Sequence, residues 1–79
     1  MEELMRLITS YIVDEPETID IECNEEPNCQ EVTLKVPEIY MGKVIGKNGR
    51  IAKAIRLIAN VKTNKNSKKV YVNIVSKDG

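Results

Sequence analysis

Two glycines, Gly46 and Gly49, interrupt an otherwise apolar, helix-like stretch of this 79-residue chain. The segment 44–51 reads VIGKNGRI, so aliphatic residues stand on both sides of a polar and flexible turn. Glycine adopts positive φ at little cost, so Gly46 can end one helix and the pair Asn48-Gly49 can form a tight turn. The chain is therefore expected to place two helices at an angle here, with the free N–H groups of the second helix beside the turn.

Patterns elsewhere in the chain predict one further helix and three strands. Apolar residues spaced three and four apart predict helices, and alternation of apolar with polar residues predicts strands. The expected helices span 2–13, 38–45 and 51–59, and the expected strands span 19–22, 32–36 and 70–75. The turn-rich segment 24–28 is short enough to join the first two strands as an antiparallel hairpin.

This order of elements predicts the sheet. A strand that returns through a helical crossover most simply lies parallel to the strand it left, so the third strand is expected parallel to the second. A chain this short has room for one sheet under one layer of helices. We therefore expect an α+β fold in a single domain, 1–79, with a mixed three-stranded sheet and three helices on one face.

Helical periodicity also predicts which side chains face the core. In the last helix the apolar stripe runs through Ile51, Ile55 and Ile58, and in the first helix the apolar face consists of Leu4, Leu7, Ile8, Tyr11 and Ile12. Of these residues, Tyr11 and Ile55 are expected in the core.

The formal net charge of zero hides an uneven distribution. Residues 1–31 contain ten acidic residues and one basic residue, whereas residues 32–79 contain eleven basic residues and two acidic ones. Each charged run taken alone is compatible with an ordinary solvated surface. Because the basic half also contains the glycine turn, it favours a localised site for a polyanion.

Several classes of function lack the residues they need. The chain has no histidine, and its two cysteines, Cys23 and Cys29, do not complete a zinc site, so neither a metal nor another cofactor is expected. The cysteines could face each other across the hairpin, but reduced thiols are the default in the cytoplasm. No nucleophile has a base partner, so we expect no enzymatic activity. No apolar run approaches a membrane span and no secretory signal is visible, which predicts a cytoplasmic protein.

The run MGKVIGKNGRIAKAIR, residues 41–56, resembles the KH domain, with Gly46-Lys47-Asn48-Gly49 as its G-x-x-G loop. The glycines stand in the pattern V-I-G-x-x-G-x-x-A-x-x-I, and the order α-β-β-α-α-β is similar to the type II form of that domain. The length and the N-terminal helix resemble the small bacterial single-domain KH proteins of the KhpA family.

The resemblance implies single-stranded RNA binding, with the loop gripping the backbone of about four nucleotides and the bases lying in an aliphatic groove. Gly46 and Gly49 would allow close approach of the RNA backbone, and Lys47 and Asn48 would face the phosphates. The other residues expected at the RNA are Lys43, Val44, Ile45, Arg50, Ile51 and Lys53. Val44, Ile45 and Ile51 can equally be groove wall or core, whereas periodicity favours the core for Ile55.

Beside this groove the resemblance places the segment between the last helix and the last strand, expected here as a polar loop from 60 to 69. It would add a secondary basic loop of Lys62, Lys65, Lys68 and Lys69.

The aromatic content argues against base stacking as the main binding mode, because the chain has three tyrosines and neither Phe nor Trp. Tyr11 is expected in the core, Tyr71 alternates with the apolar Val70 and Val72, and Tyr40 is either a site residue or an ordinary, partly exposed tyrosine.

The family resemblance also implies partners. Similarity to KhpA-like proteins implies a homodimer, or a pair with a larger KH protein, KhpB, that acts in post-transcriptional regulation or as an RNA chaperone. The alternative is a protein-interaction module that uses the same domain as a docking surface and has no RNA affinity of its own.

Overall fold

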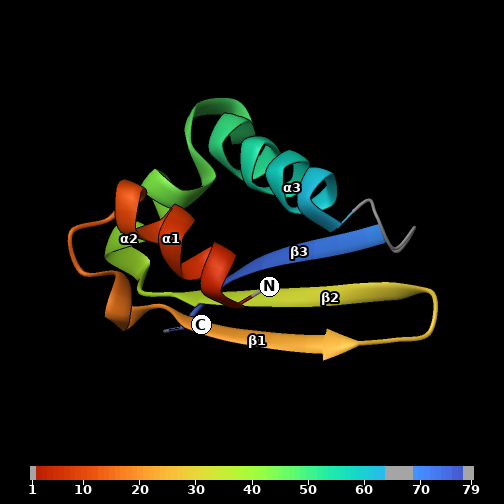
Figure 1. The fold of residues 1–79 in the computed structure, drawn as a ribbon. Coiled ribbons are helices and arrows are strands. Elements are labelled where there is room, and N and C mark those ends of the chain that lie inside the picture. Colours follow the sequence, from red (N-terminus) through yellow and green to blue (C-terminus); the bar gives the residue numbers. More distant parts are fainter. Residues whose placement is uncertain (1, 64–68, 78–79) are drawn as a thin grey trace.

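The computed structural model describes residues 2–63 and 69–77, which form three helices and three strands (Figure 1). In chain order these are α1 Glu2–Ile12, β1 Asp20–Glu25, β2 Cys29–Val36, α2 Glu38–Ile45, α3 Arg50–Thr63 and β3 Lys69–Ser76. Two short 3₁₀ turns, Pro16–Thr18 and Lys47–Gly49, precede β1 and α3. The predicted order of elements is confirmed, although the last helix continues four residues into the segment expected as a loop.

The sheet has the strand order β1-β2-β3, so β1 and β3 are its edges. Strand β1 pairs antiparallel with β2, with Ile21 opposite Leu34, and β3 pairs parallel with β2, with Val72 beside Val32. The three helices lie on one face of the sheet and leave the other face open (Figure 1). The predicted hairpin, parallel crossover and layer arrangement are all confirmed.

The core lies between the sheet and the helices. Alternate residues of β2 and β3 point toward the helices, and these side chains are at most 3% exposed. They are Val32, Leu34 and Val36 of β2 and Val70 and Val72 of β3. Burying each such side chain stabilises the fold by roughly 1.5–3 kcal/mol, so this double row is the main source of packing energy.

The buried face of α1 differs in part from the expected one. Tyr11 is 83% exposed and Leu7 is 54% exposed, whereas Met5 and Thr9 are fully buried. Leu4, Ile8 and Ile12 are partly buried and pack against the core as expected, whereas the expectation was wrong for Tyr11. Thr9 tolerates burial because its hydroxyl donates a hydrogen bond of 3.1 Å to the carbonyl of Arg6 within the same helix.

The buried stripe of α3 also differs in part. Ile55 is 1% exposed and lies in the core as expected, but Ile51 and Ile58 are 36% and 41% exposed. The other buried apolar residues of α3 are the small Ala52 and Ala59. Alanines let the helix approach the sheet closely, so the contact line runs along them and the larger isoleucines fall on its flanks.

The two cysteines do not face each other across the hairpin. Cys23 is paired with Val32, while Cys29 lies at the far end of the ladder, beyond the pair Glu25–Gln30. Both thiols are free. The possible cross-hairpin disulfide is therefore ruled out by the register.

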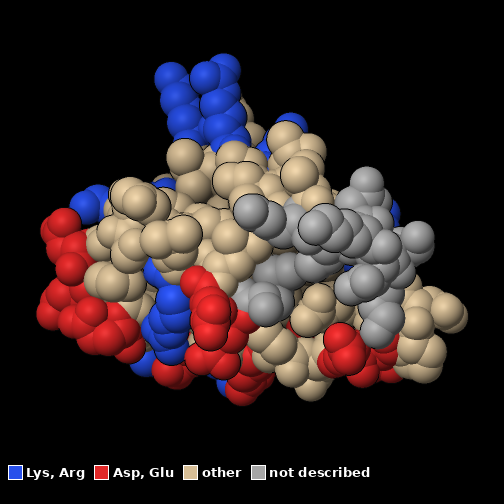
Figure 2. Space-filling view, in the orientation of Figure 1, with Lys and Arg blue, Asp and Glu red and all other residues tan. Residues whose placement is uncertain are grey.

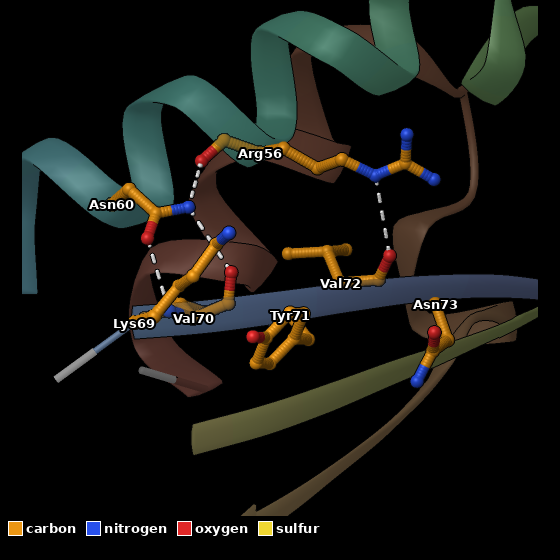
Figure 3. A pocket seen from close by; sticks show the side chains of 7 residues that line it. All are labelled: Arg56, Asn60, Lys69, Val70, Tyr71, Val72 and Asn73. Atoms are coloured by element: carbon orange, nitrogen blue, oxygen red, sulfur yellow. Dashed lines mark hydrogen bonds between the residues drawn. The ribbon is translucent and has the colours of Figure 1, made fainter. Parts of the chain in front are cut away.

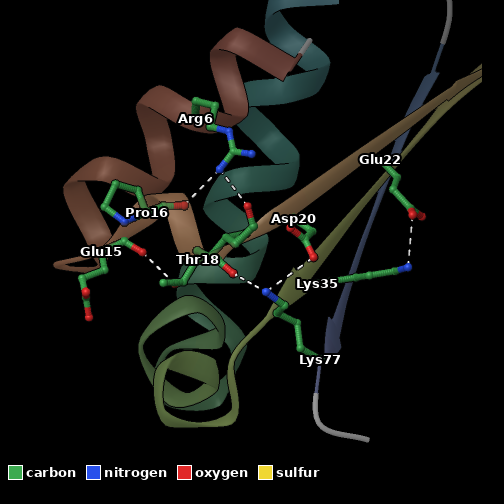
Figure 4. A network of polar contacts seen from close by, with 9 residues as sticks. Arg6, Glu15, Pro16, Thr18, Asp20, Glu22, Lys35 and Lys77 are labelled. Carbon is green, nitrogen blue, oxygen red and sulfur yellow. Dashed lines mark hydrogen bonds and ion pairs between the residues drawn. The ribbon is translucent and has the colours of Figure 1, made fainter.

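Arg6 fastens α1 to the segment that leads into β1 (Figure 4). Its Nη1 atom donates hydrogen bonds to the carbonyls of Pro16 at 3.0 Å and Ile19 at 2.7 Å. On the other side of this segment, the Nζ atom of Lys77 donates to the carbonyl of Thr18 at 2.9 Å. The segment between α1 and β1 is thus held by Arg6, near the N-terminus, and by Lys77, near the C-terminus.

Replacing Arg6 with Met keeps the apolar stem of the side chain and removes both hydrogen bonds. Because bonds from a charged donor contribute roughly 1.5–3 kcal/mol, we expect Arg6→Met to lower the free energy of unfolding by about that amount. Urea denaturation followed by circular dichroism measures the change. Lys53→Met, on the exposed side of α3, serves as the control and should stay within about 0.5 kcal/mol. Equal stability of the two variants would show that the guanidinium contributes nothing.

Candidate nucleic-acid interface

The turn between α2 and α3 is built from three residues with positive φ. Gly46 has φ 77° and ψ 172°, Asn48 has φ 59° and Gly49 has φ 76°. The N–H of Gly46 closes α2 by donating to the carbonyl of Gly42 at 2.8 Å, and the N–H of Gly49 donates to the carbonyl of Gly46 at 3.2 Å. The chain therefore reverses sharply, and α3 begins immediately at Arg50. The predicted glycine turn is confirmed.

The two glycines are required for different reasons. A Cβ atom on Gly46 would lie 2.4 Å from Cγ1 and 2.9 Å from the backbone nitrogen of Ile51, so the turn is folded directly against the start of α3. A Cβ atom on Gly49 would meet nothing within 4 Å. Gly49 is therefore required by its backbone angle alone, and its missing side chain leaves the backbone open to an approaching molecule.

Basic side chains gather around this turn. Lys47, Asn48 and Arg50 are exposed on the turn and the start of α3, and Lys43 and Lys53 are exposed on the adjoining helices. Figure 2 shows Lys and Arg side chains projecting from the end of the molecule where α2 meets α3, while Asp and Glu side chains gather on the opposite side. The charge separation seen along the sequence is thus a separation in space.

The aliphatic residues near the turn divide into core and surface. Val44 is fully buried and belongs to the core, so its assignment to a groove wall is corrected. It lies one helical turn after Tyr40 on the inner side of α2, which is the side that packs against the core. Ile45 is partly exposed and Ile51 is 36% exposed, so both remain available to a ligand.

Tyr40 is buried and is not available to stack on a base. It is 8% exposed, and its hydroxyl donates a 3.2 Å hydrogen bond to Oε1 of Glu15. Burial, together with this bond and the neighbouring carboxylates, raises the pKa of the Tyr40 phenol, so the group is neutral at physiological pH. Tyr40 joins α2 to the segment between α1 and β1, and the expectation of a partly exposed tyrosine was wrong.

A groove of about 370 Å³ lies between α3 and the outer edge of β3 (Figure 3). It is lined by Arg56 and Asn60 of α3 and by residues 69–73 of β3. Of these residues only Lys69 was predicted at the site. The spacing of Arg56 and Asn60, four apart on one helix face beside the lysine-rich segment, was the available signal.

Asn60 and Arg56 cover part of the free edge of β3. The side-chain amide of Asn60 accepts a hydrogen bond from the N–H of Val70 and donates one to its carbonyl, both at 3.0 Å. The Nε atom of Arg56 donates to the carbonyl of Val72 at 3.3 Å. An edge strand otherwise presents unpaired backbone groups. The Asn60 amide therefore supplies the hydrogen-bond donor and acceptor that a neighbouring strand would offer to the Val70 backbone.

The secondary basic loop lies mostly outside the described residues. Lys65 and Lys68 belong to the segment 64–68, and the side chain of Lys62 is not described either. Lys69 is exposed at the start of β3, with its Nζ atom 5.2 Å from the centre of the Tyr71 ring.

Comparison with known proteins decides the family. A family model described as KhpA/KhpB, KH domain, matches residues 2–74. The chain is 46% identical over 77 residues to RNA-binding protein KhpA of Clostridium perfringens, covering 95% of this chain and 100% of that protein. It is 43% identical over 75 residues to RNA-binding protein KhpA of Listeria monocytogenes, covering 95% and 99%. The chain belongs to the KhpA/KhpB KH-domain family.

In this KH domain, neither a metal site nor a membrane span is found in the part of the chain that the structure describes. Across residues 2–63 and 69–77, no three His, Cys, Asp or Glu side chains form a group that could hold a metal ion. None of the helices within the same ranges is long and apolar enough to cross a membrane.

The geometry of the KH loop predicts unequal effects of alanine at its two glycines. Gly46→Ala combines a backbone conformation that is almost restricted to glycine with a collision against Ile51, so we expect a loss of roughly 2–3 kcal/mol in unfolding free energy. Gly49→Ala meets only the cost of positive φ, about 1–2 kcal/mol. Urea denaturation of both variants and the wild type checks the order. A Gly49→Ala protein less stable than Gly46→Ala would contradict it.

Proposed function

We propose that this protein binds single-stranded RNA, with the phosphate backbone held at the turn Gly46–Gly49. The observation that carries the proposal is the bare backbone of Gly49, which lies beside the start of α3 and between the exposed side chains of Lys47, Asn48 and Arg50. The names of the two relatives, both RNA-binding proteins, support the same conclusion.

Three features of the turn favour phosphate. The helix dipole makes the start of α3 partly positive, although its first N–H, that of Arg50, already donates to the carbonyl of Lys47. Lys47 and Arg50 add full positive charges on either side, and Asn48 adds an amide donor. Because Gly49 has no side chain, a phosphate can approach the backbone of the turn closely.

The bases would lie beside the turn, along α3. Ile45 and Ile51 offer partly exposed aliphatic surface at the turn, and the groove between α3 and β3 lies farther along α3, at Arg56 and Asn60. Arg56 contributes a guanidinium with five N–H donors, of which the Nε donor bonds to Val72. Lys43, Lys53 and Lys69 would supplement the charge along this path, as would Lys62, Lys65 and Lys68 of the secondary basic loop.

A single small groove binds RNA weakly, and a second copy of the chain would raise the affinity through effective concentration. The outer side of α3 supports such a homodimer, because Leu57 and Val61 are each 67% exposed and Ile58 is 41% exposed. These three apolar residues form the outer face of α3. A larger KhpB-like KH protein is the alternative partner for this face, and regulation of RNA in the cytoplasm is the process that we propose for either assembly.

We call the proposed phosphate site at the turn Gly46–Gly49 the phosphate clamp. It is tested with Lys47→Asp combined with Asn48→Asp, which adds negative charge at the turn and spares both glycines. We expect binding to a labelled pool of short single-stranded RNAs to weaken at least about tenfold, because the carboxylates repel the phosphates. Fluorescence anisotropy measures the affinity, and circular dichroism confirms that the variant folds. Lys35→Asp combined with Asn28→Asp makes the same charge change on β2 and the hairpin, and should leave binding nearly unchanged.

Salt dependence gives a second readout of the same clamp. Three or four neutralised phosphates predict a slope of roughly −2 to −3 in a plot of log affinity against log salt concentration for the wild type. If the clamp variant binds as tightly as the wild type, the RNA uses another surface. If the wild type binds no RNA, the domain is instead a docking module for protein.

The homodimer is tested by sedimentation velocity. We expect a wild-type dimer at high micromolar concentration and a monomer for Leu57→Glu combined with Val61→Glu, because two charges would be buried in the apolar contact. Leu7→Glu combined with Tyr11→Glu, on the exposed side of α1, is the matched control and should remain dimeric. A wild-type monomer throughout this range would leave the larger KH protein as the partner.

A further inference from the structure

Tyr71 lies on the open face of the sheet, next to the groove. It is 46% exposed on the edge strand β3, and the ammonium group of Lys69 lies 5.2 Å from the centre of its ring. Of the other two tyrosines, Tyr40 is buried and Tyr11 lies on α1. Tyr71 is therefore the aromatic side chain that borders the basic groove.

The groove continues around the edge of β3 from the helix side to the open face. Arg56 and Asn60 reach it from α3, whereas Tyr71 and Asn73 line it from the other side of the strand (Figure 3). Strand alternation explains this, since Val70 and Val72 point toward the helices and Tyr71 and Asn73 point away from them. A strand of RNA that follows the groove thus arrives beside the Tyr71 ring.

Asn60 prevents RNA from forming hydrogen bonds with the backbone of β3 at Val70. Both backbone polar groups of Val70 that face the groove are already bonded to the Asn60 amide. A base that reaches Val70 finds no free backbone donor or acceptor on that residue. The next favourable surface is the face of the Tyr71 ring.

We infer that Tyr71 is a stacking platform for one further nucleotide of single-stranded RNA, beyond those held at the turn Gly46–Gly49. The inference rests on the proposed function and extends its site across the edge of β3. An exposed aromatic ring stacks on any base, and such stacking outweighs an exposed contact between a lysine and a ring. A base therefore displaces Lys69 from the ring, and the released ammonium group pairs with the phosphate of the same nucleotide.

The neighbouring charges decide on which side of the ring the nucleotide lies. Glu31 is the partner of Tyr71 on β2, so the inner side of the ring carries a negative charge. Lys69 and Arg56 line the groove at the edge of β3, and the ammonium group of Lys69 lies against the ring. The phosphate therefore lies at the edge of β3 and the base extends over the ring.

The absence of tryptophan from the chain provides a direct probe of stacking. In Tyr71→Trp the new indole is the sole tryptophan, and we expect its fluorescence to be quenched when a randomised pool of eight-nucleotide RNAs is added. A randomised four-nucleotide pool, which fills only the turn and its groove, should quench it little. Tyr11→Trp, on the exposed side of α1, is the control and should not respond to either pool.

Affinity provides the second measurement. We expect Tyr71→Ala to weaken binding of the eight-nucleotide pool by about 5- to 100-fold, to leave the four-nucleotide pool unchanged, and to be largely rescued by Tyr71→Phe. If Tyr71→Ala binds both pools like the wild type and the indole of Tyr71→Trp is not quenched, the inference about Tyr71 is wrong. The proposal that the turn Gly46–Gly49 binds phosphate is not affected by that result. If the wild type binds neither pool, the proposed function and this inference both fail.

Discussion

The contact between Gly46 and Ile51 is the constraint on which the rest of the site depends. Only a residue without a Cβ atom can occupy position 46, because the turn is pressed directly against the first residues of α3. That close contact sets the angle between α2 and α3, which in turn lets Val44 of α2 and Ile55 of α3 share one core. The same reversal leaves Lys47, Asn48 and Arg50 exposed at the start of α3, so packing and ligand access follow from one backbone geometry.

Much of the fold could be predicted from the sequence because its signals are local. The alternation in 32–36 and 70–75 and the glycine turn each specify an element within a few residues, and the connection through two helices makes the last strand parallel. The orientation of α1 could not be predicted in this way. Its apolar residues cover more than one side, and burial of Met5 and Thr9 instead of Leu7 and Tyr11 depends on the elements against which the helix packs.

The candidate site was predictable only where the residues are close in sequence. The turn with Lys47 and Asn48 is one continuous segment, so a short motif was sufficient to find it. The groove unites Arg56 and Asn60 with strand residues up to Asn73, and their proximity depends on the crossover that places α3 beside β3. Val44 shows the opposite error, because a residue next to the turn in sequence lies in the core in space.

The bond between Asn60 and Val70 has a consequence for assembly. Parallel or antiparallel addition of a foreign strand to β3 would require the backbone groups that Asn60 already occupies. Growth of the sheet from one molecule into the next is thereby discouraged at this edge. Two molecules joined through their helices would each retain an unobstructed groove, so self-association and nucleic-acid binding need not compete.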